Sequence, residues 1–207
     1  MTKSEARRAA ILRTATDVFH EAGFDRASMS DICNRVGYSK ATVYAYFKSK
    51  EELLVAIALD AAEAEYQAAR AALAEAPAGI RATLEHIGRR YLGFACAPDT
   101  LATRRLVLAE AGRAGLGNQC YDLGPGRVIA ALAALLHDAM DDGQLVEAGP
   151  ELAARHLKAL FDAEWSERLL FQAIEALGPD QLDASAARAV GVFLAAYGAP
   201  GVRTAVN

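Results

Sequence analysis

The sequence has few of the features that mark secreted, membrane-spanning or zinc-binding proteins. Only three cysteines occur in 207 residues, and their wide separation argues against a disulfide framework or a CxxC zinc site. No run of about 18 uncharged apolar residues predicts a membrane span. No apolar signal segment follows the polar, basic N-terminus. We therefore expect a cytoplasmic protein without membrane contact, whose thiols at Cys33, Cys96 and Cys120 stay reduced.

Motifs of the common enzyme classes are absent as well. The four histidines have neither HExxH nor another metal-ligand spacing; they are His20, His86, His137 and His156. No GxSxG nucleophile motif occurs, and the glycines near residue 115 follow no predicted strand that would make them a phosphate-binding loop. The sequence therefore predicts no catalytic residue, no metal and no cofactor.

The remaining pattern is helical along nearly the whole chain. Apolar residues make up 53% and charged residues 23%, as expected of a globular core with a solvated surface. No alternating β-branched stretch predicts a strand, and Gly and Pro mark the joints between helical segments. We predict an all-α protein of about nine helices.

Capping residues delimit the predicted helices. The first opens on the capping box Thr2-x-x-Glu5 and ends before Gly23, and a second box, Ser49-x-x-Glu52, opens a long helix that Pro77 stops. Pro at the first helical position and Gly past the last delimit the later segments. The other predicted helices span residues 28–36, 39–47, 79–95, 99–112, 125–141, 150–177 and 180–197, with a short piece at 118–123.

Charge is distributed unevenly along the chain. Residues 1–50 hold nine basic and five acidic residues, a net charge of +4, whereas the remainder holds thirteen and twenty-one, a net charge of −8. A basic head on an acidic body suggests that one end binds an anion.

Residues 28–47, SMSDICNRVGYSKATVYAYF, have the pattern of a helix-turn-helix. Ile32 and Val36 give the first helix an inward face, Gly37 permits the positive φ of a tight turn, and Ser39 caps the second helix. Val43 and Phe47 point inward. Lys40, Thr42, Tyr44 and Tyr46 are left to face outward, where donor groups would meet phosphates and base edges.

The longer run GFDRASMSDICNRVGYSKATVYAYFKSKEELL resembles the DNA-binding domain of TetR-family transcriptional regulators. The resemblance implies phosphate contacts for Ser28, Thr42 and Lys50, backbone contacts for the two tyrosines, and a base-facing start of the recognition helix. The residues expected at the DNA surface are Ser28, Ser39, Lys40, Ala41, Thr42, Tyr44, Tyr46, Lys48 and Lys50. Cys33 replaces a common Ala, where core packing or a redox role are both open, and Tyr38 in the turn replaces an aliphatic residue.

The same resemblance implies a division of labour along the chain. We expect a DNA-binding domain over residues 1–50, a connecting helix over 50–76, and a ligand-binding and dimerisation domain over 77–207. Residues from Arg104 to Leu145 resemble an AcrR/AefR-like second domain. In such proteins a homodimer binds a palindromic operator in double-stranded DNA, and a small-molecule effector releases it.

Two sets of residues are candidates for the roles of the second domain. A pocket between its helices would draw on His86, Arg89, Tyr91, Phe94, Arg104, Leu108, Tyr121, Phe161 and Trp165. The broad apolar faces of the last two helices predict a dimer interface made by Leu157, Phe161, Leu169, Val190, Phe193, Leu194 and Tyr197. For each set there is an alternative interpretation, in which these side chains only pack within one protomer.

The sequence thus favours a sequence-specific DNA-binding regulator, in the first place a repressor that responds to an apolar or aromatic effector. A transcriptional activator with the same head is one alternative. An all-helical ligand carrier or enzyme with an incidental basic head is the other, and salt-dependent DNA binding would argue against it.

Overall fold

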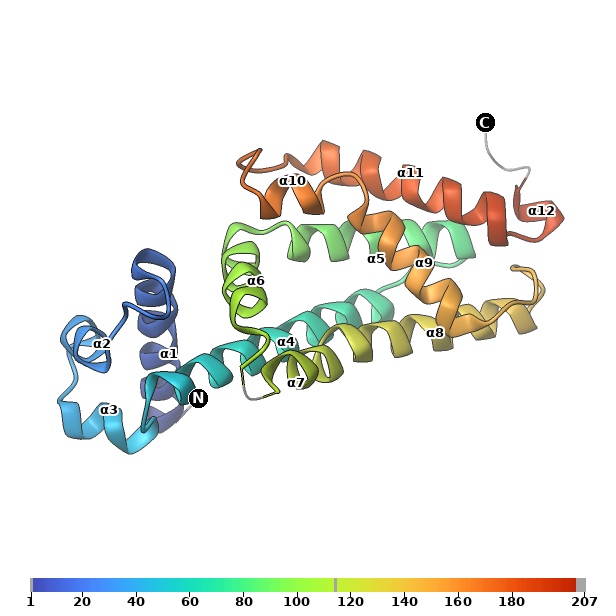
Figure 1. Cartoon of the computed structure of the whole chain (residues 1–207). Helices are drawn as coiled ribbons and strands as arrows, with labels where there is room; N and C mark the ends of the chain where they lie inside the picture. Colours follow the sequence, from blue (N-terminus) through green and yellow to red (C-terminus); the bar gives the residue numbers. More distant parts are fainter. Residues whose placement is uncertain (1, 114, 204–207) are drawn as a thin grey trace. The chain divides into compact units, whose positions relative to one another are not determined.

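A computed structural model describes residues 2–113 and 115–203, without the side chain of Arg203. Within these ranges every named element is a helix (Figure 1), which confirms the all-α prediction. The helices are α1 (Lys3–Ala22), α2 (Met29–Val36), α3 (Lys40–Tyr46), α4 (Lys50–Ala74), α5 (Ile80–Ala95), α6 (Pro98–Glu110), α7 (Leu116–Leu123), α8 (Pro125–Asp141), α9 (Pro150–Asp162), α10 (Ser166–Leu170), α11 (Pro179–Tyr197) and α12 (Pro200–Arg203).

The helix termini follow the capping chemistry of the sequence. The side chain of Thr2 accepts from the backbone N–H of Glu5 and the Glu5 carboxylate accepts from Thr2, which closes the expected capping box. At the start of α4, Ser49 Oγ accepts from the N–H of Glu52 at 3.1 Å. Local hydrogen bonds of this kind satisfy N–H groups that the helix itself leaves free.

The chain folds into two compact units. The first contains the residues up to Ala62 together with Ala102–Cys120, and the second contains Glu63–Leu101 and the residues from Tyr121 onward. Leu106, Leu116 and Cys120 join the apolar core of the first unit, because their side chains are buried against it. The stretch from α6 to α7, which the sequence places in the second domain, therefore packs with the helix-turn-helix.

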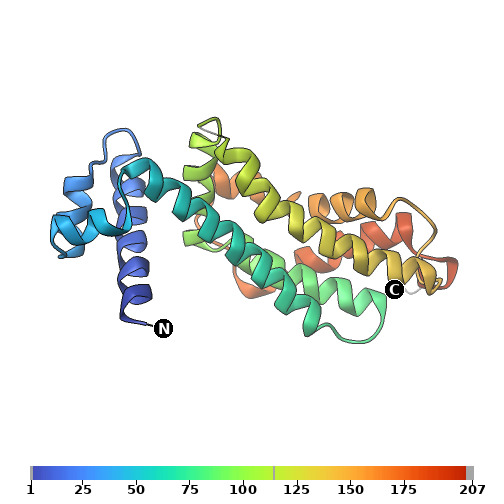
Figure 2. The same ribbon diagram turned by 90° about the horizontal axis from the view of Figure 1, so that it is seen from below.

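The second unit is built around α5, α8, α9 and α11. Their inward side chains form one core, in which Leu84, Leu136 and Leu157 are fully buried. In both views the part of α4 from Glu63 onward runs alongside α8 (Figures 1 and 2), and Arg127 of α8 pairs with Glu63 at 2.6 Å.

The prediction of one helix over 150–177 is wrong. The segment divides into α9 and the five-residue α10, and Gln172 then takes a positive φ of 57°. The break falls where the carboxylate of Asp162 accepts a hydrogen bond from Ser166 Oγ at 2.9 Å. This side-chain bond joins the two pieces across residues that are not helical.

None of the helices among the described residues is long and apolar enough to cross a membrane.

Candidate functional site

The first unit contains the helix-turn-helix that residues 28–47 predict. Ser28 caps α2 through a reciprocal capping box with Asp31. Gly37 takes a left-handed conformation, with φ 75° and ψ 15°, and so turns the chain toward α3. Ser39 Oγ then accepts from the N–H of Thr42 at 3.1 Å and starts α3. The geometry of this supersecondary motif is therefore set by two caps and one glycine.

The inward faces of α2 and α3 fix which side chains remain outside. Ile32 and Val43 are fully buried and Phe47 is 4% exposed, so both helices are anchored by apolar side chains at helical spacing. Cys33 is also buried, at 3% exposure, and packs in the same core. The opposite face of α3 presents Lys40, Ala41 and Tyr44 to solvent.

Several predicted contact residues already have partners on the head itself. The Thr42 hydroxyl lies 2.9 Å from Ser39 Oγ, the Tyr46 hydroxyl lies 3.0 Å from Ser4 Oγ, and Lys48 Nζ donates to the carbonyl of Tyr44 at 3.0 Å. These bonds are exposed to solvent, so exchanging them for bonds to phosphate requires no buried group to be uncovered.

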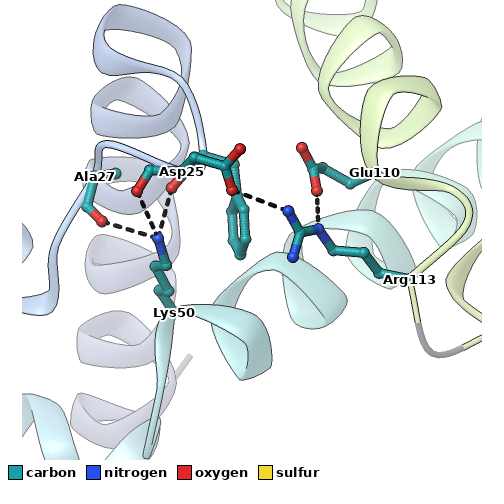
Figure 3. A network of polar contacts seen from close by, with 6 residues as sticks. Asp25, Ala27, Lys50, Glu110 and Arg113 are labelled. Atoms are coloured by element: carbon teal, nitrogen blue, oxygen red, sulfur yellow. Dashed lines mark hydrogen bonds and ion pairs between the residues drawn. The ribbon is translucent and has the colours of Figure 1, made fainter.

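Lys50, which the resemblance assigns to a phosphate contact, has other partners in the structure. Its ammonium donates to the carbonyls of Phe24, Asp25 and Ala27 at 2.9, 3.0 and 3.3 Å (Figure 3). An ammonium group has three donors, and these three carbonyls account for all of them. In this conformation Lys50 anchors the connection between α1 and α2, and a phosphate contact would require it to give up one of these bonds.

The second unit contains a small apolar cavity. Its volume is about 20 Å³, close to the space that one water molecule needs. Small-residue positions of α4 form one wall, and aromatic side chains of α5 and α9 form another. The lining residues are Glu65, Ala68, Ala69, Ala72, Leu73, Ile87, Tyr91, Phe94, Val128, Leu132, Lys158 and Phe161.

A polar cluster lies beside this cavity. Asp162 accepts hydrogen bonds from Tyr91 and Ser166 on Oδ1 and from Lys158 on Oδ2, each at 2.9 Å. Burial alone would raise the pKa of the Asp162 carboxyl, but the charge of Lys158 and the three hydrogen bonds outweigh it and lower that pKa. The carboxylate is therefore ionised at neutral pH, and it holds Lys158 and Tyr91 in place at the cavity wall.

The structure brings only part of the predicted pocket together. Tyr91, Phe94 and Phe161 line the cavity, whereas His86, Arg89 and Trp165 do not. Tyr121 and Leu108 are 42% and 60% exposed, and Arg104 lies on α6 in the first unit. Sequence reasoning missed Lys158 and the alanines of α4. The i, i+4 spacing of Ala68 and Ala72 was the only available signal, and it is common in any helix.

Six of the seven residues predicted for the dimer interface are buried within one protomer. Leu157, Phe161, Leu169, Val190, Phe193 and Leu194 are at most 2% exposed within one protomer, so they have no surface to offer a partner. The seventh, Tyr197, is partly buried against the same core and its hydroxyl bonds His156 at 2.6 Å. The broad apolar faces of α9 and α11 close the core of the second unit, because they pack on each other and on α5.

Other surfaces on these helices remain exposed. Leu152 of α9 and Val192 of α11 are 57% and 58% exposed, and Phe171, which follows α10, is 78% exposed.

Among the described residues, no cluster of three or more His, Cys, Asp or Glu side chains could hold a metal ion.

A capped helix-turn-helix on a helical body defines a class of DNA-binding regulators, and two family models place the chain within it. Residues 11–57 match the model of bacterial regulatory proteins of the tetR family. Residues 82–199, more than half of the chain, match the C-terminal domain of AefR-like transcriptional repressors. The chain belongs to the TetR family of transcriptional regulators.

Individual relatives agree with this assignment. A TetR-family transcriptional regulator from Mesorhizobium loti has a similar structure, with a TM-score of 0.84, 29% identity, and coverage of 96% of this chain and 100% of that one. The flavonoid-responsive regulator FrrA gives a TM-score of 0.72 at 28% identity, covering 94% and 98% of the two chains.

Among curated relatives, the transcriptional regulator UidR of Escherichia coli is 43% identical over 58 residues. That match covers 28% of this chain and 30% of UidR. The sequence similarity to such curated relatives is thus limited to less than a third of their length.

Proposed function

We propose that this protein is a homodimeric transcriptional repressor that binds a palindromic operator and releases it when a small apolar or aromatic molecule binds the second unit. The observation that carries the DNA-binding part is the exposed face of α3, where Lys40, Ala41 and Tyr44 stand at the start and middle of a capped recognition helix. In such motifs these positions reach base edges while neighbouring groups contact phosphates. Because the protein must reach operator DNA to act, the proposal includes a cytoplasmic location.

The effector part rests on the cavity. At about 20 Å³ it is far below the 300 Å³ or more of typical ligand sites, so a ligand must push its walls apart. Three alanines of α4 form one wall, and α4 is a single 25-residue helix that begins in the first unit. A ligand that binds only the expanded cavity shifts the population toward a displaced α4, and operator affinity changes through the same helix.

The proposal of a dimer rests on apolar side chains that are exposed on the surface of α9 and α11. Since the inward faces of α9 and α11 are used within the protomer, we propose that their outward faces, with Leu152 and Val192, meet the same faces of a second copy. A self-complementary contact of this kind gives a two-fold dimer, which matches the symmetry of a palindromic operator.

One DNA-binding experiment tests the proposal. The wild-type protein is used to select duplexes from a random-sequence library, and fluorescence anisotropy then measures the affinity of the Lys40→Ala/Tyr44→Ala double variant for the selected duplex. We expect at least about a tenfold loss of affinity. Arg90→Ala is the matched control, because it removes one exposed positive charge from α5 of the second unit, and it should bind within about twofold of wild type.

The outcomes separate the alternatives. If the wild type enriches no sequence even at low salt, the regulator proposal fails. That result would favour the hypothesis of a ligand carrier or an enzyme. The flavonoid naringenin, an aromatic probe, is added to the bound complex, and the result expected is release of the duplex. A reporter gene behind the selected duplex distinguishes the two kinds of regulator, because a repressor lowers its expression and an activator raises it.

A further inference from the structure

Two cations lie over one aromatic ring in the connection between α1 and α2. The ring of Phe24 is 4% exposed. Lys50 Nζ lies 4.6 Å from its centroid, and the guanidinium carbon of Arg113 lies 5.0 Å from it. Cations at such distances are attracted to an aromatic face. This connection is therefore held both by α4 and by the segment between α6 and α7.

Arg113 makes two further contacts that α4 does not provide. Its terminal nitrogen donates to Asp25 Oδ1 at 2.9 Å (Figure 3), and its Nε donates to the carboxylate of Glu110 at the end of α6. The Glu110 side chain is only 13% exposed, so burial restricts its motion. Glu110 thereby orients the guanidinium toward Asp25.

The position of Asp25 gives this contact its consequence. Asp25 precedes Ser28, the N-cap of α2, by three residues. Lys50 fixes the backbone of the connection through carbonyl oxygens, whereas Arg113 fixes the only side chain in it that carries a negative charge. The connection that leads into the helix-turn-helix thus contacts a residue about 90 positions later in sequence.

The segment that carries Arg113 is joined to the second unit at both ends. Ala102–Cys120 packs in the first unit, while Leu101 before it and Tyr121 after it belong to the second. A change in the second unit can therefore reach this segment along the chain from two sides, independently of α4.

We propose that Arg113 is a positioning residue for operator binding. Through Asp25 it holds the connection before α2 in the orientation that lets α3 meet DNA, and it makes operator affinity depend on the state of the segment Ala102–Cys120. This inference rests on the proposed DNA-binding function. The ion pair is exposed, at 49% for Arg113 and 81% for Asp25, so its loss should weaken binding by a modest factor of about two to five.

The opposite charges of Asp25 and Arg113 distinguish positioning from a general electrostatic effect. Asp25→Asn removes a negative charge from the head and Arg113→Gln removes a positive one, so general attraction to DNA would change in opposite directions. Positioning predicts the same direction: each variant binds the selected duplex about two- to fivefold more weakly, and the double variant is no weaker than Arg113→Gln alone. Asp25→Asn keeps the backbone carbonyl that Lys50 uses, so that contact is retained.

Two readouts separate positioning from other roles. The salt dependence of binding by Arg113→Gln should equal that of wild type, since a lost phosphate contact would instead reduce the slope by about one. Arg90→Gln, in the second unit, serves as the control for charge and should bind like wild type. Unchanged melting temperatures would show that both variants fold.

Several results would overturn the inference. Tighter binding by Asp25→Asn, additive losses in the double variant, or a reduced salt slope for Arg113→Gln would each do so while leaving DNA binding itself intact. A wild type that selects no duplex would instead defeat the proposed function, so the two failures are distinguishable.

Discussion

Gly88 lies where α5 packs closely against α9 and α11. It is in α5, and a Cβ added to it would lie 2.5 Å from Cε1 and 2.9 Å from Cζ of the Phe161 ring on α9, and 3.1 Å from Cβ of Ala186 on α11. Phe161 is 1% exposed, so its ring has little freedom to retreat. Replacing Gly by Ala within a helix normally gains about 1 kcal/mol, whereas overpacking a buried contact costs about 1–3 kcal/mol.

Gly88→Ala is therefore expected to be neutral or to destabilise the protein by up to about 2 kcal/mol. Gly93→Ala in the same helix is the matched control, because nothing lies within 4 Å of its added Cβ, and it should stabilise by up to about 1 kcal/mol. The difference between the two variants isolates the steric cost, about 1–3 kcal/mol. For a chain of this length that corresponds to roughly 2–12 °C in melting temperature.

Thermal unfolding followed by far-UV circular dichroism measures this difference. The fluorescence of Trp165, the only tryptophan, reports the second unit separately because it packs against that core. Phe161→Leu removes the clashing ring atoms, so Gly88→Ala should turn stabilising in that background. The reasoning is refuted if Gly88→Ala and Gly93→Ala melt together in the wild-type background.

Two further predictions concern the second unit. Because the folded pKa of Asp162 is lowered, its ionised form adds stability above the unfolded value of about 4 that is lost as pH falls through the folded pKa. Asp162→Asn should flatten the decline in unfolding free energy below about pH 4, and an unaltered acid profile in urea titrations would contradict the assignment. If the proposed dimer forms through this face, Val192→Glu should give a monomer in analytical ultracentrifugation. It should also lower operator affinity at least about tenfold, since two half-sites are no longer bound together; a variant that stays dimeric would exclude this face.

The helix-turn-helix was predictable because its determinants are local. Caps at Ser28 and Ser39 bond to residues three positions away, and Gly37 supplies its own positive φ. Val43 and Phe47 are buried at the spacing that one helical face requires. Each of these choices can be made from the neighbouring residues alone, and local preference agreed with the final fold.

Assignments that depended on a partner helix were less predictable. The apolar faces of α9 and α11 have the same composition whether they cover a neighbouring helix or a second protomer, and Val190 and Phe193 proved to be buried within one chain. Lys50 has the residue type of a phosphate contact, yet three carbonyls at least 23 positions earlier in sequence occupy its ammonium. Periodicity shows that a face is apolar and leaves open what it meets.

The sequence by itself determined the all-α class, the helix-turn-helix and the exposed face of α3, because capping, turn formation and amphipathic spacing act over a few residues. Only the tertiary structure decided that Ala102–Cys120 packs with the helix-turn-helix unit, that Arg113 reaches Asp25, and that alanines of α4 and Phe161 line one small cavity. These contacts join positions tens of residues apart. They depend on how whole helices pack, which no local pattern encodes.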